Sequence, residues 1–181
     1  MTTRAGQLYK VLAENGQPHH GGTGVWPLPN GKPGEWLEIT GELVPCENGL
    51  HLCRQSDLLG WLGPVIHTAE YDGEMIEHND KIVVRRARLI ERLDTWNDRT
   101  ARLFAADCAE RVLHLYESKY PDDSRVRNAI EVARKVANGE LDISELAAAG
   151  DAAGAAAWAA AGDAEREWQQ ARLFEYLDGT A

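Results

Sequence analysis

The hydrophobic pattern of this chain changes its period once, around Asp94-Thr95. Upstream, stretches such as Leu8–Leu12 alternate apolar and polar residues, which is typical of a strand with one buried face. Downstream, Phe104, Cys108, Val112 and Leu115 recur at steps of three or four, which is typical of an amphipathic helix. The sequence therefore predicts an α+β protein with a β-rich domain at 1–94 and an α-helical, alanine-rich domain at 95–181.

Turn-forming residues divide the first domain into short strands. Strands are expected at Leu8–Leu12, 36–40, 49–53, Val65–Tyr71 and Lys81–Ile90, with a short helix beginning at Ser56-Asp57. Asp72-Gly73 and Asn79-Asp80 are predicted turns, and the residues between them could add a further strand. The result would be a mostly antiparallel sheet with one small helix.

A long loop is expected at 18–34, where four of the seven prolines and several glycines interrupt both helix and strand patterns. Loops of this length in compact domains usually serve a function or are mobile. Trp26, near the centre of the loop, is expected to pin at least one point of it, and it is also a candidate partner-binding residue.

The second domain should contain several helices. The first is expected to end before Pro121, and the second should run from Asp123-Ser124 to Asn138-Gly139 and pack antiparallel to the first. A third would pass through an alanine-rich repeat, in which residues 147–152 recur at 159–164. A last segment, Glu165–Leu177, restores large side chains that could anchor the C-terminus.

Charge and cysteine content restrict the classes of function. The chain has 19 Lys and Arg against 29 Asp and Glu, a net charge of −10, which argues against direct binding to nucleic acid. Three cysteines are too few for a disulfide scaffold and fit a reducing compartment. The first residues lack a signal-peptide pattern and no stretch is apolar enough to span a membrane, so the expected location is the cytoplasm.

Few residues have the spacing of a metal or cofactor site. Cys46, His51 and Cys53, with His19-His20 upstream, include the side chains that bind zinc, but their spacing matches no standard zinc motif. There is also no glycine-rich phosphate loop and no G-x-S-x-G motif. We therefore expect no metal and no cofactor. The one basic cluster, Arg85-Arg86-Ala87-Arg88, is expected to form a face of salt bridges.

Two alternative sites remain open. ADP-ribosyltransferases use an Arg or His on an early strand, an aromatic or Ser on a second strand and a later Glu, and Tyr9, His51 and Glu70 could take such catalytic roles. Alternatively, an acidic surface binds a protein partner. The candidates for that surface are the carboxylates of the first long helix and of the turn after it: Asp107, Glu110, Glu117, Asp122 and Asp123.

Two resemblances bear on this choice. The N-terminal half, with its Trp26-Pro27-Leu28-Pro29 and Gly49-Leu50-His51-Leu52-Cys53 segments, resembles an uncharacterised domain of bacteriophage and actinobacterial proteins. The C-terminal half, with segments such as Thr100–Phe104, Asp107–Leu113 and Ala129–Arg134, resembles immunity proteins of polymorphic-toxin systems.

Together the resemblances imply a non-enzymatic protein-binding module of phage or mobile-element origin, acting in a bacterial host cell. Its partner would be a toxin or a host-defence protein, possessing a basic or nucleic-acid-binding site that an acidic surface can block. A small ADP-ribosyltransferase-like enzyme and a structural or assembly protein remain as alternatives.

Overall fold

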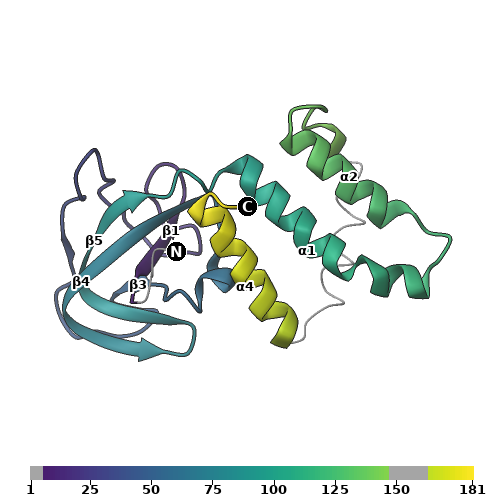
Figure 1. The fold of residues 1–181 in the computed structure, drawn as a ribbon. Coiled ribbons are helices and arrows are strands. Elements are labelled where there is room, and N and C mark those ends of the chain that lie inside the picture. The colour runs from purple at the N-terminus through teal and green to yellow at the C-terminus, as the bar shows by residue number, and fades with distance from the viewer. Residues whose placement is uncertain (1–5, 147–162) are drawn as a thin grey trace. The chain divides into compact units, whose positions relative to one another are not determined.

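The computed structural model describes residues 6–146 and 163–181, which fall into two compact units (Figure 1). The sheet unit comprises Met1–Asp94 and the helical unit Thr95–Ala181. An antiparallel sheet in the first and helices in the second confirm the α+β class. That the two units are separately folding domains stays a prediction.

The sheet unit is built from five strands that are all paired antiparallel. The order is β1-β4-β5-β2, and β3 pairs with β5 beside β2. The predicted short helix is present as a 3-10 helix at Leu58–Trp61. The strands are β1 Leu8–Leu12, β2 Leu37–Glu38, β3 Leu50–Leu52, β4 Val65–His78 and β5 Lys81–Arg92.

The hairpin of β4 and β5 corrects one predicted turn. Asn79-Asp80 does form the two-residue connection, since His78 pairs with Lys81. Asp72-Gly73 does not turn the chain: β4 continues through it, and a bulge lies between Asp72 and Met75. Gly73 has a φ of +84°, so the residue that suggested a turn supplies the backbone conformation of a bulge instead.

The strands of the sheet unit close on themselves. Two backbone hydrogen bonds join Tyr9 on β1 to Cys53 just after β3, with N to O distances of 2.9 and 2.8 Å. Because β3 also pairs with β5, the pairing runs from β1 through β4, β5 and β3 back to β1. Residues of β1 and of the end of β3 therefore lie side by side at this junction.

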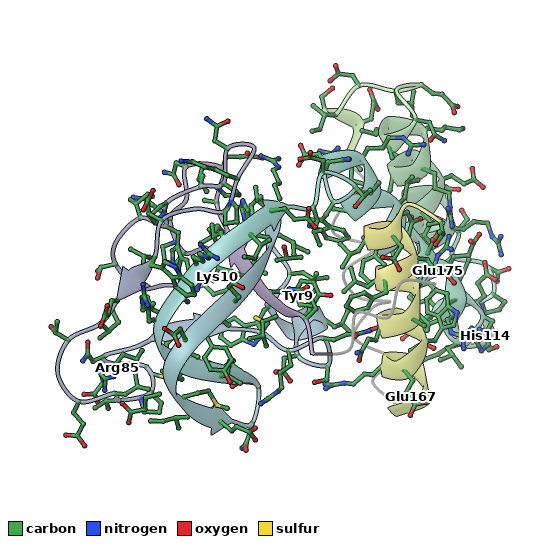
Figure 2. The ribbon with its side chains drawn as sticks, turned by 60° about the vertical axis from the view of Figure 1, so that its left-hand side comes forward. Tyr9, Lys10, Arg85, His114, Glu167 and Glu175 are labelled. Carbon is green, nitrogen blue, oxygen red and sulfur yellow. The ribbon has the colours of Figure 1, made fainter. Side chains whose placement is uncertain are left out.

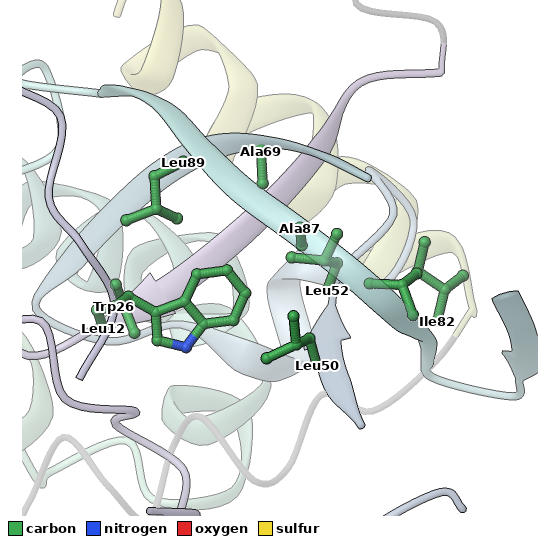
Figure 3. Packing of buried hydrophobic residues seen from close by; sticks show 9 residues of the cluster. Leu12, Trp26, Leu50, Leu52, Ala69, Ile82, Ala87 and Leu89 are labelled. Atoms are coloured by element: carbon green, nitrogen blue, oxygen red, sulfur yellow. The ribbon is translucent and has the colours of Figure 1, made fainter. Parts of the chain in front are cut away.

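The core of the sheet unit forms around Trp26. The indole is 4% exposed and packs in one cluster with side chains from β1, β3, β4 and β5 (Figure 3). The prediction that Trp26 pins the 18–34 loop is thus confirmed. The other buried members of the cluster are Leu12, Leu50, Leu52, Ala69, Ile82, Val84, Ala87 and Leu89.

The helical unit contains α1 at Asp98–Lys119, α2 at Arg125–Ala137 and α4 at Asp163–Asp178. Asn97 and Thr100 form a capping box that fixes the start of α1. Salt bridges from α2 back to α1 join Arg127 to Glu117 and Arg134 to Glu110, so the two helices are antiparallel as predicted. The alanine-rich part of the predicted third helix, 147–162, lies outside the described residues.

Ala106, Ala109 and Leu113 of α1 pack against Val126 and Ile130 of α2 in a second hydrophobic cluster. Small residues on one helix let the other approach closely. Among the described residues, none of the helices has the length and apolar character that crossing a membrane requires.

Candidate functional site

The sheet unit contains a partly open cavity of about 220 Å³. Its walls come from β1, the 18–22 segment of the long loop, Cys46, β3, the 3-10 helix and the first residue of β5. Its polar side chains include Lys10, His20, His51 and Lys81. The cavity therefore lies at the junction where β1 meets β3.

Lys10, next to Tyr9 on β1 (Figure 2), is the central charged group of this cavity. Its Nζ donates a hydrogen bond to the backbone oxygen of His51 at 3.0 Å and lies 5.0 Å from the centre of the Trp26 ring. No carboxylate forms an ion pair with it among the described residues. Burial lowers the pKa of Lys10 to about 8, although the nearby Cys53 thiol acts in the opposite direction.

Lys81 is the second cation of the cavity wall and is buried. Its Nζ lies 5.1 Å from the centre of the Trp61 ring and 3.4 Å from Asp80 Oδ1. Asp80 is largely exposed and also binds His78 Nδ1 at 2.9 Å, so it neutralises Lys81 only in part. Each lysine of the cavity thus stacks over a tryptophan ring.

His51 is held in one orientation at the cavity. The backbone N–H of Cys46 donates to His51 Nε2 at 3.2 Å. Cys46 has a φ of +68°, the one positive value at a non-glycine residue in the described chain. Burial, and then the charges of Lys10 and Lys81, lower the pKa of His51. A neutral His51 accepting at Nε2 carries its proton on Nδ1 and is a donor there.

The cysteines and histidines considered for zinc do share this cavity, since Cys46, His51 and Cys53 all line it. They are nevertheless not arranged as a metal site: among the described residues, no group of three or more His, Cys, Asp or Glu side chains could hold an ion. Burial also raises the pKa of the Cys53 thiol to about 12, which disfavours the thiolate that binds metals. The absence of a bound metal stays a prediction.

The three residues considered for ADP-ribosyltransferase chemistry are not brought together in this cavity. His51 lines it, whereas Tyr9 is fully buried in the core and Glu70 forms an ion pair with Arg88 at 2.5 Å. Neither Tyr9 nor Glu70 is among the described residues that line the cavity. The geometry gives these residues no common site.

The basic cluster on β5 forms the predicted face of salt bridges. Arg85 pairs with Glu74, Arg86 with Asp72 and Arg88 with Glu70. As strand alternation predicts, Arg86 and Arg88 share a face, and both guanidinium groups lie over the Trp36 ring, at 4.5 and 4.6 Å from its centre.

In the helical unit, Asp107 is not part of an exposed acidic surface. It is 8% exposed, and its carboxylate joins three helices: Arg134 of α2 lies 2.7 Å away, Arg172 of α4 2.8 Å away, and the Tyr176 hydroxyl donates to it at 2.8 Å. The sequence interpretation of Asp107 as a spare surface group is therefore wrong, because α4 covers it.

The other predicted partner-binding carboxylates are mostly paired within the unit. Glu110 binds Arg134 at 2.7 Å and Glu117 binds Arg127 at 2.6 Å. Asp123 binds Arg125 at 2.6 Å and accepts a hydrogen bond from the Tyr116 hydroxyl. Asp122 is exposed and forms no ion pair among the described residues. Trp26, the remaining candidate, is a core residue whose side chain no partner can reach.

The acidity of the helical unit is concentrated after α2. Residues 98–137 hold seven Asp and Glu and eight Lys and Arg. Residues 138–181 hold nine Asp and Glu but two Lys and Arg. In the segment that follows α2, Glu140, Asp142 and Glu145 are exposed, and within the described residues none forms an ion pair. Between them Leu141 and Ile143 are 39% and 59% exposed. We call residues 140–145 the acidic-apolar segment.

Residues 91–171 match the family described as "Imm-5 like putative immunity protein". This finding supports an immunity-type protein-binding role for the C-terminal part of the chain. No curated protein and no solved structure matches the chain. The resemblance of the N-terminal half to a phage and actinobacterial domain stays a prediction, as does the cytoplasmic location.

The sequence analysis gave no role in binding to the acidic-apolar segment, and it left Lys10, Lys81 and Trp61 out of any site. Two signals for the segment were present in the sequence, namely the change in charge balance after α2 and the alternation of acidic with apolar residues. No signal in the sequence brings Lys10 and Lys81 together, since 70 residues separate them and only strand closure does so.

Proposed function

We propose that this chain is an immunity-type protein that binds and neutralises a toxin through its helical unit. The observation that carries the proposal is the family match over residues 91–171, which includes α1, α2 and the acidic-apolar segment. Neutralisation of a toxin by binding requires no catalytic group on this chain.

The acidic-apolar segment is the proposed contact surface. Interfaces need apolar side chains that can be buried, and charges at their edges that select a partner of opposite sign. Leu141 and Ile143 supply the first, and Glu140 and Glu145 supply the second. A toxin with a basic cleft, such as one that binds nucleic acid, is the partner that this surface fits.

The carboxylates of α1 and of the following turn make a weaker surface. Glu110 and Glu117 already bind arginines of α2, so a partner would have to compete with those ion pairs. Asp122 lacks such a pair, and together with Glu117 it serves as the comparison site.

The test is affinity capture with two matched double variants of the full chain. Glu140→Lys/Glu145→Lys should lower capture of the partner, and more so at low salt, where charge attraction is less screened. Glu117→Lys/Asp122→Lys reverses the same number of charges and should capture as the parent does. A captured protein counts as the partner only if it stops growth when expressed alone and co-expression of this chain restores growth.

Each other outcome is informative. Loss of capture in the Glu117/Asp122 variant alone would move the interface to the α1 surface. Normal capture by both variants would show that the acidic surface is not the interface. A captured protein that does not stop growth would contradict the immunity role itself.

A further inference from the structure

The charge of Lys10 is the most unusual feature that the proposed function leaves unused. An ammonium group has three donors, and the described residues provide one acceptor, the backbone oxygen of His51. Burying a charge without a partner is costly, so buried charges are normally paired. In the helical unit Asp107 follows that rule, with two arginines against one carboxylate. Lys10 is partly buried, and no carboxylate forms an ion pair with it among the described residues.

The described residues that line the cavity with Lys10 add a positive charge and no carboxylate. Lys81 lines the same cavity, and a neutral His51 adds a donor at Nδ1. No Asp or Glu is among the described residues that line the cavity. Asp80 is the carboxylate closest to Lys81, and it is shared with His78. The cavity thus has the electrostatic character of an anion site.

The rest of the wall is apolar and of limited size. Val11, Leu52 and the Trp61 ring contribute carbon surface. A volume of about 220 Å³ is smaller than the range of typical drug-sized sites. It exceeds the roughly 150 Å³ that suffices for benzene in an apolar cavity. The space therefore suits one ring with a charged substituent.

The loop that forms one wall is fixed in place. His20 Nε2 lies 2.8 Å from the Trp61 oxygen and 3.0 Å from the Leu62 oxygen. At Gly63 a Cβ atom would lie 2.6 Å from the His19 ring and 2.7 Å from Val11, so only glycine permits this close packing. The cavity is consequently formed before any ligand binds.

We propose that this cavity binds a small organic anion: a carboxylate or phosphate group attached to a single ring. Lys10 holds the charged group, Lys81 strengthens the positive potential, and Trp61 and Leu52 contact the ring. Nucleic acid does not fit, since the cavity is small and the chain has a net charge of −10. A cation is repelled by the two lysines.

The experiment is a titration of the full chain, followed by tryptophan fluorescence and by amide NMR signals. Benzoate and phenylphosphonate are the two anionic probes, and they separate carboxylate from phosphate-type recognition. Benzamidine, of similar shape but positive charge, is the control probe. We expect both anions, or one of them, to bind and shift the signals of residues 10, 51 and 61, whereas benzamidine does not.

Lys10→Met keeps the length of the side chain and removes its charge, and it should weaken anion binding by about tenfold or more. Lys32→Met is the matched control, because Lys32 is exposed and is not among the described residues that line the cavity, and it should bind as the parent does. If Lys10→Met fails to fold, judged by its NMR spectrum, Lys81→Met provides the same test. The proposal is overturned if neither anion binds at about 10 mM, if benzamidine binds equally well, or if loss of the lysine charge leaves affinity unchanged.

Discussion

The two units of this protein differ in how they treat a charge that is shielded from solvent. In the helical unit Asp107 is buried against Arg134 and Arg172, and the three groups join α1, α2 and α4. In the sheet unit Lys10 is partly buried at the junction of β1 and β3, without a carboxylate partner in the described residues. A buried charge with ionic partners holds elements together, whereas a partly buried charge without a carboxylate partner is a candidate for binding a ligand.

Substitution of Trp26 is expected to have the largest effect on the free energy of unfolding. Trp26→Ala should destabilise the sheet unit by about 4 kcal/mol, because it removes the centre of the core cluster and leaves a cavity. Trp168→Ala should cost far less, since Trp168 is partly exposed and packs on Arg111. Urea unfolding, monitored by amide hydrogen exchange in each unit, measures the loss of unfolding free energy in both variants. Equal costs would contradict the assignment of Trp26 to the core.

Asp107 should show the next largest effect, and it lies in the other unit. Asp107→Ala leaves Arg134, Arg172 and the Tyr176 hydroxyl without their shared acceptor, and we expect a loss of about 3 kcal/mol. Glu110→Ala also removes an ion pair to Arg134, but an exposed one, and should cost about 0.5 kcal/mol. Similar losses from the two variants would show that Asp107 does not join the helices.

His67 makes the sheet unit sensitive to acid. Burial, and then the charge of Arg92, lower the pKa of His67 to about 4. Between pH 6.5 and 4 the unfolded chain binds a proton that the folded chain does not, so stability falls as the pH falls through this window. The expected loss is about 3 kcal/mol. In His67→Gln the slope of unfolding free energy against pH should flatten, and an unchanged slope would exclude His67 as its cause.

The sequence predicted those features of the fold that are determined within a single segment of the chain. Leu8–Leu12 forms the predicted strand, and α1 ends before Pro121, because alternation and proline act on their own segment. Asp72-Gly73 misled the prediction, since the same positive φ at glycine serves a turn and a bulge. The pairing along the whole of β4 and β5 decides whether Gly73 forms a turn or a bulge.

The candidate sites depended on contacts distant in sequence. Asp107 is polar and falls off the apolar stripe of α1, so its burial follows only from Arg172, 65 residues later. The cavity needs a lysine from each of β1 and β5, and closure of the strands through Tyr9 and Cys53. Composition alone did indicate where acidic residues concentrate, and the family match lies in the same half of the chain.

The central claim is that partner binding belongs to the helical unit and does not use the cavity of the sheet unit. The most direct measurement is growth of cells that express the captured toxin together with the parent chain, Lys10→Met, or Glu140→Lys/Glu145→Lys combined with Ile143→Asp. The account predicts that Lys10→Met protects as well as the parent and that the combined variant, folded by its circular dichroism spectrum, does not protect. Loss of protection in Lys10→Met, with full protection by the combined variant, would contradict it.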